Sequence, residues 1–152
     1  MKPLVQFIKE KLIIKKNKAT NYKYFPKTKE ELQDIIKKRI EQEGNEVDLN
    51  DIDVSKIKDM SYLFEETYFN GDISKWDVSN VTNMRYMFNG CSKFNQDISD
   101  WNVSNVTDMY NMFGRCKSFN QDISNWDVSN VKYANNVFND CQIEEKYKPN
   151  FK

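Results

Sequence analysis

A pattern of apolar positions recurs every 25 residues through the second half of the chain. The stretches that begin at Trp76 and Trp101 read WDVSNVTNMRYMFNGCSKFNQDISD and WNVSNVTDMYNMFGRCKSFNQDISN, a third begins at Trp126, and a copy one residue shorter begins at Ile52. A fixed period of this length is typical of stacked repeat proteins. We therefore divide the repeats, residues 52–141, into the units 52–75, 76–100, 101–125 and 126–141.

Within a unit, the spacing predicts a helix followed by extended chain. Val81, Met84 and Phe88 recur at three and four residues, as on one face of a helix, and Thr82 is a suitable N-cap. The stretch 97–103 is rich in β-branched and aromatic residues and is too short for a helix. The predicted fold class is α/β: a leucine-rich-repeat-like solenoid of four coils, each with a short helix and a short parallel strand, and an N-terminal helical cap.

The chain before the repeats does not follow this period. We interpret residues 1–18 as an amphipathic arm and residues 19–51 as a linker and a capping helix. The sequence TKEE at 28–31 matches a capping box, and Gly44 suits a helix end. A helix over 28–43 is therefore predicted to cover the open end of the first unit.

After Cys141 the period is lost. Polar residues replace the next unit, and Pro149 prevents further strand pairing. We expect residues 142–152 to form a C-terminal cap, with Ile143 and Tyr147 folded over the last apolar positions.

Composition excludes several classes of protein. A chain of 152 residues with 39% hydrophobic residues is long and apolar enough for one folded domain. It contains no histidine, the side chain most used for acid–base catalysis and metal binding. Neither a catalytic triad nor a phosphate loop is present, so we expect no enzyme activity and no cofactor. Basic and acidic residues number 23 each, which gives no electrostatic reason to expect a nucleic-acid partner.

The first apolar run is too short to direct export. Lys9, Glu10 and Lys11 interrupt it, and no lipidated cysteine lies nearby. No stretch reaches the ~20 apolar residues of a transmembrane segment. We therefore expect no transmembrane segment, and a chain that is cytoplasmic as made or associated with a virion.

Some residue columns could carry chemistry. Cys91, Cys116 and Cys141 lie one period apart, and a buried ladder is favoured over a metal or redox site. Packing is likewise favoured for the tryptophans, with a sugar-stacking face as the alternative. A further column of asparagines is expected to satisfy backbone groups at turns. That column comprises Asn80, Asn105 and Asn130.

Asp72, Asp97 and Asp122 form an aspartate column. Stacked carboxylates repel one another unless backbone N–H groups or a cation compensate their charge. We favour backbone hydrogen bonds, and calcium is the alternative. No other metal site is predicted.

The positions that vary most between units lie between the methionine and phenylalanine columns, where they are expected to face solvent. We regard them as the candidate protein-binding face. Its residues are Tyr62, Arg85, Tyr86, Tyr110, Asn111, Asn135 and Asn136.

The string VSNVTNMRYMFNGCSKFNQDISDW resembles the repeat of BspA-like leucine-rich-repeat surface proteins, in the branch of mycoplasma-type surface lipoproteins. The resemblance covers residues 52–141 and implies a solenoid for adhesion or protein binding, at a cell surface. In addition, FIKEKLIIKK is similar to the start of some tailed-phage open reading frames of gut bacteria. That second resemblance implies a virion component.

Two functions follow. The first is a monomeric, non-enzymatic binding module for protein–protein interaction or adhesion, whose partner is a protein such as a cell-surface component. The alternative is a structural or host-interaction part of a larger assembly such as a tailed-phage virion, docked through residues 1–18 onto a virion protein.

Overall fold

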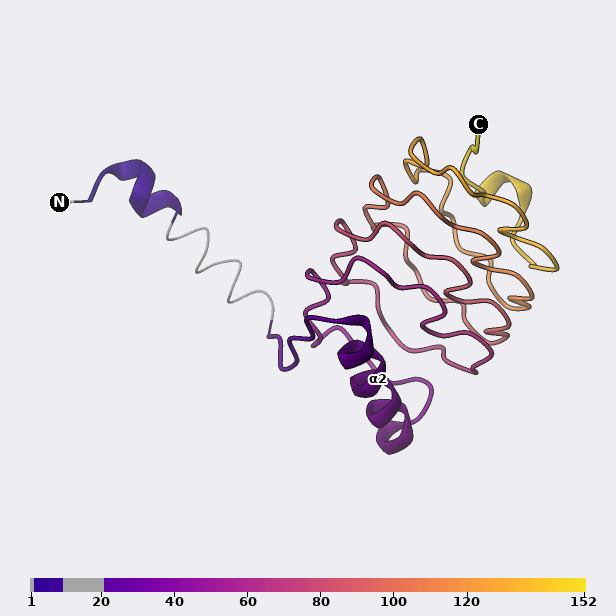
Figure 1. The fold of residues 1–152 in the computed structure, drawn as a ribbon, viewed down its shortest axis with the longest axis horizontal. Coiled ribbons are helices and arrows are strands. Elements are labelled where there is room, and N and C mark those ends of the chain that lie inside the picture. Colours follow the sequence, from indigo (N-terminus) through magenta and orange to yellow (C-terminus); the bar gives the residue numbers. More distant parts are fainter. Residues whose placement is uncertain (1, 10–20) are drawn as a thin grey trace.

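The computed structural model describes residues 2–9 and 21–152. Within them, residues 4–9 are helical, α2 spans Lys29–Glu43, and η1 is a single 3-10 turn at Glu145–Tyr147. The remainder of the arm predicted at 1–18 lies outside the described residues. Figure 1 shows the repeats laid side by side, from α2 at one end to the C-terminus at the other.

The expected α/β leucine-rich-repeat-like solenoid of four coils is wrong. None of residues 44–144 is helical, and the described part of the chain contains no β-strand. It contains only isolated parallel bridges, three of which join successive units at Asp59, Asn83, Asp108 and Tyr133. The 25-residue period is nevertheless visible in space, because each unit, built of turns and short extended pieces, lies against the next (Figure 1).

Two successive turns take the place of the predicted helix. In the second unit the N–H of Met87 donates to the carbonyl of Met84 at 3.1 Å, which closes the first turn. Tyr86 in this turn and Gly90 in the next have left-handed φ values of 55° and 71°. Left-handed residues interrupt a right-handed helix, although two turns preserve the apolar spacing of three and four residues. The equivalent residues elsewhere are Tyr62, Asn111 and Asn136 in the first turn and Glu66, Arg115 and Asp140 in the second.

Backbone hydrogen bonds join the units through alternate residues. In the second unit, four N–H groups donate to carbonyls of the third at 2.8–3.0 Å, and the first and third units repeat the pattern. These N–H groups are therefore satisfied by a neighbouring unit rather than within a helix. We call the four groups of each unit its donor row. The rows are Met60, Tyr62, Phe64 and Glu66; Met84, Tyr86, Phe88 and Gly90; Met109, Asn111, Phe113 and Arg115; and, by equivalence, Ala134, Asn136, Phe138 and Asp140.

Short polar side chains bend the chain elsewhere in each unit. Asp77 accepts the N–H of Ser79 at 3.1 Å, and Asp97 accepts that of Ser99 at 2.9 Å. Such Asx-turns compete with extended structure because they give the backbone a local partner. This is why the strand expected over 97–103 does not form.

The apolar columns make one continuous core. The ring of Phe88 stacks on those of Phe64 and Phe113, with centroids 5.5 and 5.4 Å apart. The tryptophans stack in the same way, and the indole N–H of Trp101 donates to the carbonyl of Ile73 at 3.1 Å. Phe88, Phe94, Trp101 and Phe113 therefore each have an equivalent ring on both sides.

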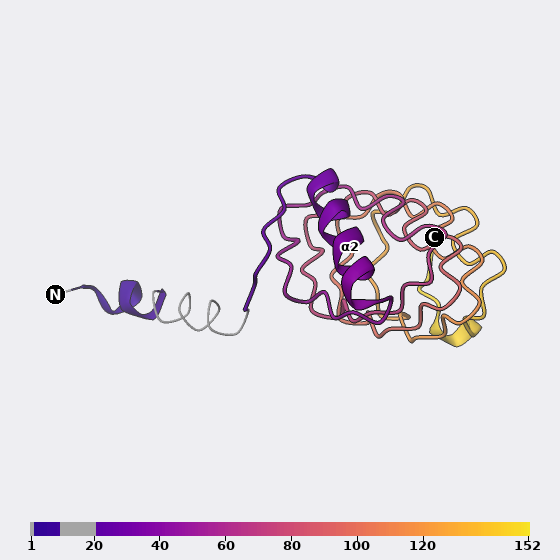
Figure 2. The ribbon, with the colours of Figure 1, turned by 90° about the horizontal axis from the view of Figure 1, so that it is seen from below.

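The predicted capping helix is confirmed. Thr28 Oγ1 accepts the N–H of Glu31 at 3.2 Å, and Gly44, with φ 89°, closes the last turn of α2. Leu32 and Ile36 are buried in the same core as the repeats. Figure 2 shows α2 lying against the N-terminal end of the stack.

The C-terminal segment extends the fourth unit. The N–H of Glu144 donates to Asn120 Oδ1 at 2.9 Å, as the N–H of Asn120 does to Asn95 Oδ1 at 3.0 Å. Glu144 lies 24 residues after Asn120, whereas Asn120 lies 25 residues after Asn95. The tail therefore continues the stack with a spacing that is one residue shorter. Ile143 is buried, and Tyr147 packs half-buried against the core.

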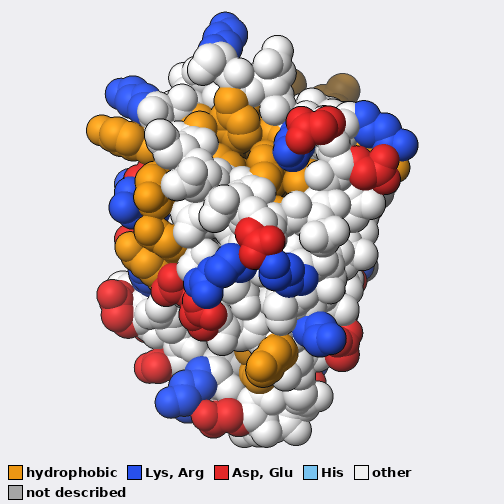
Figure 3. Space-filling model, turned by 90° about the vertical axis from the view of Figure 1, so that its right-hand side faces the viewer, with side chains coloured by type: hydrophobic (Ala, Val, Ile, Leu, Met, Phe, Trp, Pro, Cys, Tyr) orange, Lys and Arg blue, Asp and Glu red, His pale blue; other side chains and the backbone are white. Residues whose placement is uncertain are grey.

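The C-terminal end of the stack is incompletely covered. Phe138 is only partly buried, although its ring lies 6.4 Å from that of Phe151. In the third unit, by contrast, Phe113 is fully buried. Figure 3 shows hydrophobic side chains gathered in the upper part of the face on the C-terminal side.

None of the helices in the described ranges is long and apolar enough to cross a membrane, as the sequence predicted.

Candidate functional site

Turns place the tyrosines of the candidate face one unit apart. Tyr62 and Tyr86 occupy the left-handed position of the first turn, and the N–H of Tyr62 donates to the carbonyl of Arg85 at 3.0 Å. Asparagine, at 111 and 136, tolerates this conformation far better than tyrosine does. Tyrosine at this position therefore has a conformational cost that asparagine avoids.

Three tyrosine rings form a continuous aromatic strip. Tyr62 and Tyr86 stack with centroids 5.1 Å apart and ring planes 12° apart. Tyr110 lies 5.4 Å beyond Tyr86, tilted by 57°. Tyr62 is 43% exposed, and Tyr86 and Tyr110 are half-buried. The strip is accessible to a partner at its edges while its rings hold one another in place.

Arg85 lies over this strip. Its guanidinium carbon is 4.4 Å from the ring centroid of Tyr110 and 5.3 Å from that of Tyr86, within the range of cation–π attraction. A nitrogen of the same guanidinium lies 3.7 Å from Asp108. A hydrogen bond with Tyr62 raises the pKa of Arg85, and burial together with a hydrogen bond to Tyr110 raises the pKa of Tyr86 above 10.0. The face therefore presents the protonated hydroxyl of Tyr86 and the positive charge of Arg85 at neutral pH.

A second cation reaches the face from α2. The ammonium of Lys29 donates to Ser61 Oγ at 2.7 Å and lies 5.6 Å from the ring centroid of Tyr62. Asp59 is 3.9 Å away from the same nitrogen. The sequence prediction did not include Lys29, because only the packing of α2 on the first unit brings it there.

The remaining predicted residues of the face are asparagines, which make its C-terminal part polar. Asn111 donates from Nδ2 to Asn89 Oδ1 at 3.0 Å, and Asn135 and Asn136 are exposed. The structure thus brings four of the seven predicted residues, the three tyrosines and Arg85, into mutual contact. The asparagines follow as the C-terminal part of the same face. We call the contacting group, Tyr62, Arg85, Tyr86 and Tyr110, the tyrosine–arginine face.

Each member of the aspartate column has a local partner. Asp72, Asp97 and Asp122 accept the N–H of the serine two residues later at 2.9, 2.9 and 3.0 Å. Hydrogen bonds from that serine lower the pKa of Asp97 and Asp122. Across residues 2–9 and 21–152, no three His, Cys, Asp or Glu side chains are grouped to hold a metal ion.

The cysteine column is part of the core. Cys91 and Cys116 are fully buried free thiols, and Cys141 is half-buried. Burial raises the pKa of Cys91 to about 11 and also raises those of Cys116 and Cys141. These thiols remain protonated at neutral pH and are poor nucleophiles and metal ligands.

The side chains of two asparagine columns form hydrogen bonds with backbone groups of neighbouring units. Asn80 and Asn105 donate to carbonyls of the preceding unit at 2.8 and 2.7 Å. The sequence analysis missed a second column, Asn70, Asn95 and Asn120, although each of these residues directly follows a phenylalanine of one core column. Asn70 Oδ1 accepts the N–H of Asn95 at 2.9 Å, so these side chains join successive units.

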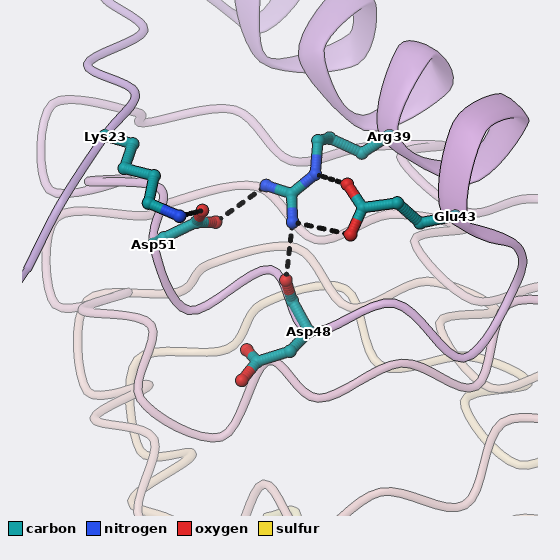
Figure 4. A pocket seen from close by; sticks show the side chains of 5 residues that line it. All are labelled: Lys23, Arg39, Glu43, Asp48 and Asp51. Atoms are coloured by element: carbon teal, nitrogen blue, oxygen red, sulfur yellow. Dashed lines mark hydrogen bonds and ion pairs between the residues drawn. The ribbon is translucent and has the colours of Figure 1, made fainter.

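A small pocket lies between α2 and the segment that leads into the repeats (Figure 4). Arg39 fills its centre: it donates to Asp51 Oδ1 at 2.8 Å, to the carbonyl of Asp48 at 3.1 Å, and to Glu43. Lys23 lies 3.7 Å from the other carboxylate oxygen of Asp51. Because Arg39 of α2 bonds to Asp48 and Asp51, these contacts tie α2 to the segment that leads into the repeats.

The fold defines the chain as a tandem-repeat protein of stacked 25-residue units, with an aromatic and cationic face. The chain belongs to the family described as "Mycoplasma protein of unknown function, DUF285", whose match covers residues 30–150 and so includes all but the first residue of α2 and all four units. No curated protein and no solved structure matches the chain.

Proposed function

We propose that the chain is a non-enzymatic binding module for protein–protein interaction or adhesion, and that the tyrosine–arginine face contacts the partner. The contact of Arg85 with the stacked tyrosines is the observation that carries this proposal. Tyrosine and arginine are among the residues that dominate binding energy at protein interfaces. Because the rings already hold one another, little side-chain entropy remains to be lost on binding.

The backbone at Tyr62 and Tyr86 supports the proposal. A tyrosine in the left-handed region costs energy that asparagine in the same column avoids. Unfavourable backbone conformations of this kind concentrate at functional sites. The exposed amides of Asn135 and Asn136 supply the polar rim that surrounds the centre of most interfaces.

The chain itself offers the variant that tests this face. In the fourth unit, Asn135 and Asn136 occupy the positions of Arg85 and Tyr86, so the double variant Arg85→Asn/Tyr86→Asn copies a pair that this backbone already accommodates. The matched control is Tyr133→Asn, which removes a 58% exposed tyrosine that lies outside the tyrosine–arginine face.

Both variants and the wild type are immobilised, and a displayed library of random peptides is selected against the wild type. We expect selected peptides to bind the wild type and Tyr133→Asn equally, and to bind the double variant about 30-fold more weakly, as the loss of a hot spot implies. Failure to enrich any peptide, or equal binding to the double variant, would contradict the proposal.

A finer relationship, to BspA-like surface proteins of the mycoplasma type, forms part of the same proposal. The order of VSNVT, MF, Cys and FNQDIS within each unit supports it. A BspA-like protein would act at a cell surface, and the alternative location is the cytoplasm. Surface labelling of intact producing cells, followed by mass spectrometry, distinguishes the two locations.

The alternative is a component of a larger assembly such as a virion, docked through residues 1–18. One observation favours it: Leu4, Val5 and Ile8, on the helical residues 4–9, are 72%, 63% and 47% exposed. Deletion of residues 1–18 separates the two functions. Loss of incorporation into particles supports assembly, whereas unchanged peptide binding by the same deletion variant supports the binding module.

A further inference from the structure

The fourth unit keeps the backbone conformation of the others, but residues 142–152 do not form a fifth unit after it. Asn136 and Asp140 have left-handed φ values of 59° and 55°, as their equivalents do. The turn from Phe138 to Cys141 closes at 3.2 Å, like the corresponding turn of the third unit. The donor row of the fourth unit therefore points away from the third unit, beyond the end of the stack.

These four N–H groups are unused. Within the described part of the chain, the N–H groups of Ala134, Asn136, Phe138 and Asp140 have no hydrogen-bond partner. Every corresponding N–H of the first three units donates to a carbonyl 23 or 24 residues later. An open row of N–H groups is a template for pairing with another chain.

Apolar side chains flank this row. Val131, Ala134, Phe138 and Cys141 are partly exposed, whereas the equivalent residues of the third unit are fully buried. The hydrophobic side chains seen on the C-terminal side in Figure 3 gather at this end. A segment placed over the row would therefore gain both hydrogen bonds and apolar contact.

Any segment that binds over the fourth donor row must offer carbonyl groups to its four N–H groups. Two copies meeting by their C-terminal ends would oppose N–H to N–H and form no such bonds. A second copy could offer only the unused carbonyls of its first unit, yet α2 packs against that end and its Lys29 contacts Ser61 there. A second copy would first have to displace α2, whereas a segment of another protein that takes the same turns as residues 107–115 meets the requirement directly.

We propose that the C-terminal end of the stack binds a segment of a partner protein, which takes the same turns as residues 107–115. This segment presents main-chain carbonyls at every second residue to the donor row of the fourth unit and apolar side chains to Phe138. This surface is separate from the tyrosine–arginine face and does not depend on it.

The chain supplies the probe. Residues 107–115 cover the donor row of the second unit through the carbonyls of Asp108, Tyr110, Met112 and Gly114. A synthetic peptide of this sequence, blocked at both ends, is added to the full chain, and amide hydrogen exchange is measured by NMR. At about 1 mM peptide, we expect exchange at the four N–H groups of the fourth donor row to slow by about tenfold. The donor row of the third unit serves as the internal reference.

Two variants that add the same charge test the location. Ala134→Asp places a carboxylate beside the incoming carbonyls and should weaken peptide binding by about tenfold or more. Asn125→Asp adds the same charge at an exposed position outside both proposed binding surfaces, and should leave the affinity unchanged.

Three results would overturn the proposal. The first is unchanged exchange at the four amides of the wild type at that peptide concentration, a readout that does not depend on how well either variant folds. The second is equal peptide binding by both variants. The third is protection that rises with protein concentration without peptide, which would assign this end to a second copy of the chain.

Discussion

Replacement of Phe113 by alanine tests the stacked core most directly. This ring is fully buried in the third unit and contacts rings in its own unit and on both sides. Its centroid lies 4.4 Å from that of Phe119, 5.4 Å from Phe88, 5.7 Å from Phe138 and 6.2 Å from Trp126. Alanine would leave a cavity that neighbouring units, held by their hydrogen bonds, cannot close.

The expected cost follows from the buried area. An aromatic side chain buries about 150–250 Å², which at ~25 cal/mol per Å² corresponds to about 4–6 kcal/mol. Alanine retains part of this contact, so we expect Phe113→Ala to lower the free energy of unfolding by about 3–5 kcal/mol. For a chain of this size the melting temperature should fall by about 6–20 °C.

Phe138→Ala is the matched control. This ring is the equivalent residue of the last unit, is only partly buried, and contacts the rings of Phe113 and Phe151. Its loss should cost about 1–2 kcal/mol. Urea unfolding of both variants, followed by tryptophan fluorescence and circular dichroism, measures the difference. Equal destabilisation would show that the inner units are not packed more tightly than the last one.

Three further predictions concern single side chains. Burial raises the pKa of Cys91 from 9.0 to about 11, so the folded protein binds more protons than the unfolded chain in this range. The free energy of unfolding should therefore fall as pH rises from 9.0 towards 11. In urea titrations, Cys91→Ala should make this fall less steep. Rapid labelling of Cys91 by a thiol reagent in the native protein would refute its burial. Hydrogen bonds from Ser99 lower the pKa of Asp97 below 3.8, so its contribution is complete above that pH and is lost as pH falls through the lowered value. Asp97→Asn, which keeps the acceptor, should reduce acid sensitivity in urea titrations, and an unchanged acid limb would contradict this origin. Arg39→Met should cost about 2 kcal/mol, because it removes the hydrogen bonds of Arg39 to Asp51 and to the carbonyl of Asp48. Amide exchange in α2 should accelerate, and unchanged exchange would mean that the ion pairs do not hold the helix.

The period and the columns could be predicted because they depend only on which residues recur. Phe88 and Cys91 are core positions in any fold that stacks the units in register, and Thr28 and Gly44 mark the ends of α2 through local chemistry alone. The helix predicted in each unit was wrong for a physical reason. A spacing of three and four residues fits two turns as well as one helix, and bonds to the next unit, together with the left-handed Tyr86, favour the turns.

The sequence also predicted part of the candidate site. Variation between units identified Tyr62, Tyr86, Tyr110 and Arg85, which the structure brings into contact. It could not identify Lys29, because this residue reaches the face only through the packing of α2. Nor could it show that the fourth unit ends in unpaired N–H groups, since that depends on which way the backbone points.

The donor rows also give the stack an electrical direction. In the second unit the N–H of Met84 points forward while the carbonyl of Asn83, in the same peptide group, points back towards Met60, and the other alternate peptide groups repeat this orientation. Their dipoles therefore add along the stack, as they do in a helix, with the positive end at the last unit. Aligned hydrogen bonds polarise one another, so each inner bond is strengthened by neighbours that a terminal bond lacks. Opening of the fold should accordingly spread from the last unit inward, and each further repeat would strengthen the repeats before it.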